Sequence, residues 1–294
     1  MNITKRKPLG ITMLCELILY CIYSIIMTNV AKHVSPLALA ILSCTLATVW
    51  LIIPVFIYLR LTKAKFTELL ILTNDRTRKP SKSIITFIFA LSITVSAVNV
   101  ISLASEWAFS VFGMQSSAIS SSNVSELVFL FIRNVLIAAV FEEILMRGVV
   151  LNATKGAADG KRVFISALLF ALIHCNLHSF FYAFAAGAVI AYFTLKMNSV
   201  IFGIALHLCQ NGITFAFTVL SQKIQKSAFD TFSAICFFVF LAIACIGILF
   251  TALNEHKMRS VAPKNTNLIK IREFFSAELI AFTVAASLIT VLTF

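Results

Sequence analysis

The chain has 294 residues, of which 60% are hydrophobic and only 12% are charged, and its mean hydropathy is +0.97. Soluble globular domains carry about twice that share of charged residues, so the composition excludes a soluble domain and predicts a protein embedded in a lipid bilayer. The formal net charge of +12 would favour a nucleic-acid partner in a soluble protein, but in a membrane protein basic residues also determine topology.

Apolar runs long enough for membrane spans recur along the whole chain, and the fifth, sixth and ninth of them are short. They cover residues 9–30, 36–58, 84–104, 126–152, 163–178, 180–195, 200–220, 231–253 and 279–294. A span needs about 20 apolar residues, and only helices satisfy their own backbone hydrogen bonds in lipid when no strand-type alternation is present. The predicted fold is therefore an all-α polytopic membrane helix bundle with eight to nine transmembrane helices.

Basic residues are distributed unevenly between the two sides of these spans. Threading nine spans from a cytoplasmic N-terminus puts nineteen Lys and Arg residues in the cytoplasm and only Lys32, Lys223 and Lys226 outside. This asymmetry is the positive-inside pattern. It accounts for the basic excess, so we expect the lipid bilayer as the partner and no nucleic acid.

Intramembrane polarity is concentrated in the middle of the chain, which divides it into three parts. Residues 1–125 hold three apolar spans, residues 126–220 hold the polar helices, and residues 221–294 hold two further spans. All seven cysteines fall inside predicted spans, where structural disulfides are not expected. Cys175 and Cys209 adjoin the polar residues described next, and we interpret both as packing residues rather than nucleophiles.

The fourth span carries the most informative cluster, Glu142-Glu143-x-x-x-Arg147. An ionisable group at bilayer depth is costly unless it is paired or hydrated. Glu143 and Arg147 are spaced i,i+4 with the acid first, which favours an ion pair along one helix face. Glu142 is rotated by about 100° from its neighbour and needs another partner.

His174, His207 and Asn211 are the polar residues that reach a similar depth from other helices. Counted from the cytoplasmic helix ends, Glu142 lies about 20 Å deep, His174 about 18 Å, His207 about 12 Å and Asn211 about 18 Å. A carboxylate beside an imidazole can activate a water molecule, and His207 with Asn211, spaced i,i+4, can donate N–H groups to an oxyanion. The depths suggest that substrate enters from the cytoplasmic side or laterally from lipid.

The ordered set Glu142-Glu143-x-x-x-Arg147, Phe170-x-x-x-His174 and His207-x-x-x-Asn211 resembles the three motifs of the CPBP intramembrane proteases, the CAAX-protease and bacteriocin-processing group also called Abi. The resemblance covers about residues 126–220. It implies peptide-bond hydrolysis in which Glu142 and His174 activate water, His207 and Asn211 stabilise the oxyanion, and Glu143 and Arg147 support the site. It also implies an integral protein of a cell membrane, and we expect the plasma membrane of a bacterium.

Metal dependence is an open alternative, because Glu142, His174 and His207 could form a three-ligand zinc site. We favour a directly activated water, since the sequence has no His-Glu-x-x-His helix and Asn211 suits an oxyanion better than a metal. A serine-type site fits less well because the sequence has no Gly-x-Ser-x nucleophile loop with a His partner, and an aspartyl site because Asp75, Asp159 and Asp230 all lie in predicted loops.

The substrate class and two rival functions also remain open at this stage. The resemblance allows a prenylated CAAX-type protein or a bacteriocin or pheromone peptide. A proton-coupled transporter and a catalytically idle bacteriocin-immunity protein are the alternatives.

Three further polar residues lie outside the motifs. We expect Arg133 to snorkel or pair near the outer face and His178 to lie at the outer interface. Glu16 is expected either to be neutral in the bundle or to line a substrate entrance.

Overall fold

The computed structural model describes residues 6–70, 72, 83–113, 123–259 and 276–292, and within these ranges the chain is helical and contains no strand. This confirms the all-α prediction. The elements are α1 (Arg6–Val30), α2 (Pro36–Thr62), α3 (Phe66–Leu69), α4 (Ser83–Val111), α5 (Val124–Phe131), η2 (Ile132–Ile137), α6 (Ala138–Glu143), η3 (Ile144–Val150), α7 (Leu151–Ala153), α8 (Asp159–Leu172), α9 (Leu177–Met197), α10 (Val200–Ser221), α11 (Lys226–Arg259) and α12 (Ala277–Leu292).

Each of the nine predicted spans corresponds to a helical segment, but only seven of those described are long and apolar enough to cross a membrane. The two shorter helices are α8, with 14 residues, and α12, with 16. At 1.5 Å per residue α8 is about 21 Å long, which is less than the roughly 30 Å hydrocarbon core. The described part of the chain thus has seven helices of full spanning length and two shorter ones, where the sequence predicted eight to nine spans with three short.

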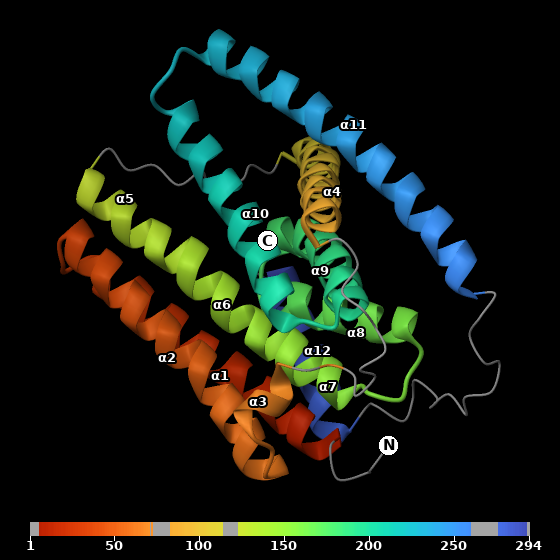
Figure 1. Ribbon diagram of the computed structural model, residues 1–294. Helices are drawn as coiled ribbons and strands as arrows, with labels where there is room; N and C mark the ends of the chain where they lie inside the picture. The colour runs from red at the N-terminus through yellow and green to blue at the C-terminus, as the bar shows by residue number, and fades with distance from the viewer. Residues whose placement is uncertain (1–5, 71, 73–82, 114–122, 260–275, 293–294) are drawn as a thin grey trace.

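The helices form two groups on either side of the polar segment (Figure 1). On one side α1 packs against α2 and α12, and on the other α4 packs against α9 and α11. The continuous helix from α5 to α7 contacts α2 on one flank and α10 on the other. The η3 stretch of that helix is buried along its whole length, so the centre of the bundle lies there.

Short polar caps set the turns that connect α8, α9 and α10. The Asn176 side chain accepts a hydrogen bond from the backbone N–H of Ser179 and begins α9, and Ser199 does the same for Phe202 at the start of α10. Such caps satisfy the free N–H groups of a first helical turn. Cys175 and Asn198 adopt left-handed backbone conformations at these two turns, with φ of 46° and 52°.

The helix with the paired glutamates is irregular. Glu142 and Glu143 lie on the short α-helical stretch α6. Two π-helical stretches, η2 before it and η3 after it, flank α6. π-Helical turns are rare and recur at functional sites. They change which residues share a helix face, and regular periodicity therefore cannot predict which side chains of this helix lie together.

Candidate active site

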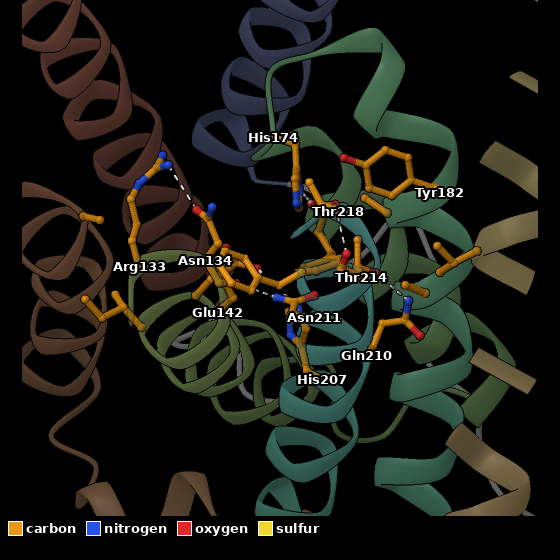
Figure 2. Close-up of a pocket in the computed structure, with 18 of the residues that line it drawn as sticks. Arg133, Asn134, Glu142, His174, Tyr182, His207, Gln210, Asn211, Thr214 and Thr218 are labelled. Carbon is orange, nitrogen blue, oxygen red and sulfur yellow. Dashed lines mark hydrogen bonds and ion pairs between the residues drawn. The ribbon is translucent and has the colours of Figure 1, made fainter. Parts of the chain in front are cut away.

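Side chains from three segments of the polar region line one cavity of about 580 Å³. Glu142 comes from α6, His174 from the turn after α8, and His207 and Asn211 from α10. Figure 2 shows these four side chains around a common space. The convergence that similar depths predicted is therefore present, although depth alone could not show that the faces meet.

Behind the cavity, Glu143 and Arg147 form the expected i,i+4 ion pair. Their side chains are fully buried, with Arg147 Nη1 2.8 Å from Glu143 Oε1. Arg147 Nη2 donates to the backbone carbonyl of Gly187 at 3.1 Å, and the guanidinium carbon lies 4.9 Å from the centre of the Phe170 ring. The arginine thus connects the η3 helix to α8 and α9.

His207 bridges the two adjacent glutamates. Its Nδ1 lies 3.0 Å from Glu143 Oε1, and its Nε2 lies 4.0 Å from Glu142 Oε2. When Nδ1–H donates to the buried Glu143 carboxylate, Nε2 is directed to the Glu142 side of the ring. Glu143 therefore orients His207 in addition to pairing with Arg147. The spacing in the sequence predicted the pair with Arg147 but not the contact with His207.

A glycine on α10 makes room for the Glu143 carboxylate. A Cβ added at Gly203 would lie 2.9 Å from Glu143 Oε2 and 2.5 Å from Thr194 Oγ1, so any larger residue would force one of these side chains to shift. Glu143 Oε2 and Thr194 Oγ1 are both buried without a hydrogen-bond partner among the described residues. The close approach of α10 to α6 consequently depends on the missing side chain at this position.

The predicted span over residues 163–178 placed His174 inside a helix, but in the structure His174 lies outside α8 and α9. α8 ends at Leu172, and His174 occupies the tight turn before α9. Its Nδ1 lies 2.8 Å from the carbonyl oxygen of Phe170, and its ring packs at 5.0 Å against the Phe170 ring. With Nδ1–H donating to that carbonyl, Nε2 is left as the basic nitrogen. Because α8 is short, its end brings an imidazole to the cavity rather than to a membrane surface.

Asn211 is held by the irregular part of the acidic helix. Its Nδ2 donates to the backbone carbonyl of Asn134 at 2.9 Å, and Asn134 lies in the π-helical stretch η2. A side chain inserted into a helix backbone ladder is one of the causes of such irregularity. One Nδ2 hydrogen is occupied in this way, and the second remains available to a ligand in the cavity.

Several cavity residues were not among the predicted site residues. Tyr20 and Trp50 come from α1 and α2, and Arg133, Asn134 and Gln210 lie on the polar segment itself. None belongs to a motif, and their only sequence signal was polarity or aromaticity within an apolar span. Arg133 lines the cavity instead of simply snorkelling, whereas His178 packs against Phe109 with ring centres 4.5 Å apart and does not line it.

The cavity extends in one direction from these groups. Its lining follows α10 from His207 to Gln222 and reaches back to Leu127 on α5. It therefore runs toward the end of the bundle where α5 begins and α10 ends, which our threading assigns to the outer side. The shape of the cavity therefore does not support the expected access from the cytoplasmic side.

No preformed metal site exists among the described residues. No group of three or more His, Cys, Asp or Glu side chains there is arranged to hold an ion. His207 Nδ1 lies 3.0 Å from Glu143 Oε1, and its Nε2 lies 4.0 Å from Glu142 Oε2, a separation that one bridging water or substrate oxygen can span. A zinc site with Glu142, His174 and His207 as ligands stays an alternative, which cleavage in the presence of a chelator tests.

Comparison with known families gives one match. Residues 124–213, about a third of the chain, match the family model described as "Type II CAAX prenyl endopeptidase Rce1-like". The matched segment contains every predicted site residue, from Glu142 to Asn211. No curated protein and no solved structure matches the chain.

Proposed function

We propose that the chain is an intramembrane endopeptidase of the CPBP type, because residues 124–213 match the family model of type II CAAX prenyl endopeptidases. The observation that carries the proposal is the cavity lined jointly by Glu142, His174, His207 and Asn211. Peptide hydrolysis needs a base for water, donors for the oxyanion and a space that excludes bulk water. These four side chains and the cavity provide all three.

In the proposed first step, Glu142 and His174 activate a water molecule. The Glu142 carboxylate removes a proton as the water oxygen adds to the substrate carbonyl, and the His174 Nε2 nitrogen orients the water. The proton then passes from Glu142 to the amide nitrogen as the C–N bond breaks, which yields a carboxylic acid and an amine. No residue forms a covalent intermediate, and Cys209, which does not line the cavity, takes no part.

The tetrahedral intermediate carries negative charge on the former carbonyl oxygen. His207 Nε2 and the free Nδ2 hydrogen of Asn211 are the donors that stabilise it. In the imidazolium form of His207, Nδ1–H donates to Glu143 and Nε2–H donates to the oxyanion, so the Glu143 carboxylate stabilises the positive charge of the ring. Glu143 and Arg147 thus act by orienting and polarising His207, without contacting substrate.

The substrate is a peptide associated with the membrane. A prenylated CAAX-type protein and a bacteriocin or pheromone-type peptide are the two classes to test. The bilayer location of the cavity requires that the peptide partition into lipid before cleavage. We also propose a bacterial plasma membrane with the N-terminus in the cytoplasm, on the basis of the basic-residue threading.

The test is cleavage of a panel of prenylated and unprenylated membrane peptides by purified protein in detergent, with and without a chelator. We expect Glu142→Gln and His174→Ala each to lower kcat by at least about 10²-fold, the lower range for removal of a general acid or base. Cys209→Ala is the matched control on α10 and should retain wild-type cleavage. Retention of activity in chelator supports the metal-free mechanism.

Two outcomes would overturn this proposal. Full activity of folded Glu142→Gln protein would remove Glu142 from the chemistry. Failure of folded wild-type protein to cleave any peptide of either class would instead favour the proton-coupled carrier or the immunity protein, and Glu142→Gln should then abolish flux in the first case and change nothing in the second.

A further inference from the structure

The hydroxyl group of Thr194 differs from those of other buried threonines in this bundle. Thr94 and Thr290 each donate to the carbonyl oxygen four residues before them, at 2.7 and 2.8 Å, which is the common way to satisfy a hydroxyl inside a helix. Thr194 lies in the last turn of α9 and is fully buried, and its Oγ1 has no hydrogen-bond partner in the described part of the chain. A buried hydroxyl without a partner costs free energy, so we expect its partner to lie outside its own helix.

Glu143 Oε2 is a buried acceptor close to this hydroxyl. Thr194 Oγ1 and Glu143 Oε2 lie 2.5 and 2.9 Å from the point that a Cβ at Gly203 would occupy, so the two oxygens are at most about 5.4 Å apart, the sum of these distances. A hydroxyl donates to a carboxylate at about 2.5–2.7 Å. A small rotation of either side chain, or one bridging water, is enough to complete such a contact.

The two oxygens of the Glu143 carboxylate are unequally occupied. Arg147 Nη1 lies 2.8 Å and His207 Nδ1 lies 3.0 Å from Oε1, whereas Oε2 is buried with no hydrogen-bond partner among the described residues. The last torsion of a glutamate side chain is broad, so donors on one oxygen alone do not fix the plane of the carboxylate. A donor at Oε2 fixes this plane, and with it the direction in which Oε1 faces the imidazole.

We propose that Thr194 is a positioning residue of the active site, whose hydroxyl donates to Glu143 Oε2 and thereby holds Oε1 against His207. This inference rests on the proposed peptidase function and adds to it a residue outside the three motifs. Thr194 does not line the cavity, so it acts on the substrate only through Glu143 and His207. Removal of its hydroxyl should therefore lower kcat and leave KM unchanged.

The kinetic experiment compares two substitutions of Thr194 on the best-cleaved peptide of the panel. Thr194→Val keeps the shape of the side chain without a donor and should lower kcat about tenfold, as expected for loss of one hydrogen bond to a charged group. Thr194→Ser keeps the donor and should retain kcat within about twofold. Thr94→Val is the matched control and should keep the wild-type kcat, since it removes a hydroxyl that is equally buried but bonded within its own helix.

A second measurement needs no substrate. The proton on His207 Nδ1 is observed by NMR of protein that carries isotope-labelled histidine, and its signal is assigned by its loss in His207→Gln. The signal should shift in Thr194→Val and in the smaller Thr194→Ala, because the acceptor Glu143 Oε1 changes its direction. It should stay at the wild-type position in Thr194→Ser and Thr94→Val.

Three results would overturn the role of Thr194. They are an unshifted His207 signal in Thr194→Val and Thr194→Ala, a wild-type kcat in the same variants, and an equal loss of kcat in Thr94→Val. Absence of any cleavage by wild type counts instead against the peptidase, and a shifted His207 signal would then still support the contact between Thr194 and Glu143.

Discussion

Two glutamates are fully buried in different regions of this membrane protein, and their surroundings differ. Glu143, in the family-matched segment, contacts Arg147 at 2.8 Å and His207 at 3.0 Å. Glu16, on α1 outside that segment, accepts a hydrogen bond from Trp50 Nε1 at 2.9 Å. Its second oxygen, Oε2, is buried without a partner among the described residues.

The difference shows that the two regions contribute to the cavity in different ways. Glu143 compensates a buried cation and orients an imidazole that faces the proposed chemistry. Glu16 instead fixes the indole of Trp50, whose ring lies 5.3 Å from Tyr20 and 4.9 Å from Tyr23. Trp50 and Tyr20 line the cavity, so the flanking helices supply an aromatic wall opposite the motif residues.

The largest effect on stability should come from breaking the ion pair in the first region. Arg147→Met leaves the Glu143 carboxylate buried without its cation, which typically costs about 3–5 kcal/mol. Thermal unfolding in detergent measures the loss. The double variant Glu143→Leu, Arg147→Met should recover a large part of that stability while remaining inactive, because His207 loses its orienting partner. A double variant no more stable than Arg147→Met would show that the arginine stabilises through its Gly187 and Phe170 contacts instead.

A smaller effect should follow from filling the space beside Glu143. Gly203→Ala places a methyl group against Glu143 Oε2 and Thr194 Oγ1, and such overpacking costs about 1–3 kcal/mol. It should also lower kcat by displacing the carboxylate that orients His207. Gly212→Ala on the same helix is the matched control, since its new Cβ meets only Val135 at 3.9 Å. Equal behaviour of the two variants would contradict the role assigned to Gly203.

The sequence was sufficient for the helical fold and for the four motif residues that line the cavity, Glu142, His174, His207 and Asn211. Hydropathy located all nine helical segments, and the charges inside apolar runs indicated Glu142, Glu143 and Arg147. It was not sufficient for the bounds of α8, because the helix ends at Leu172 and the capped turn at Cys175 and Asn176 follows within the predicted span. The division into residues 1–125, 126–220 and 221–294 stays a prediction, and the cavity draws side chains from the first part as well as the second.

The missed residues have a common physical origin. Arg133 and Asn134 face the cavity through the π-helical geometry of η2, whereas face assignments from sequence assume 3.6 residues per turn. Trp50 reaches the cavity because α2 packs against the acidic helix, and Tyr20 reaches it from α1, which packs against α2. No periodicity within a single span reports which neighbouring helix that span contacts.

The smallest effect should come from the second region, where Trp50→Phe retains a ring but removes the indole donor to Glu16. Loss of one hydrogen bond of this kind costs about 1 kcal/mol, and the released Glu16 carboxyl group should allow the aromatic wall to shift. Trp107→Phe is the matched control, because Trp107 is the only other tryptophan and is 73% exposed. Thermal unfolding of both variants, read by the fluorescence of the tryptophan that remains and by circular dichroism, measures the difference. If Trp50→Phe were as stable as Trp107→Phe and retained the wild-type KM, the aromatic wall would not depend on Glu16, and the buried acid would lack the positioning role that distinguishes the two regions.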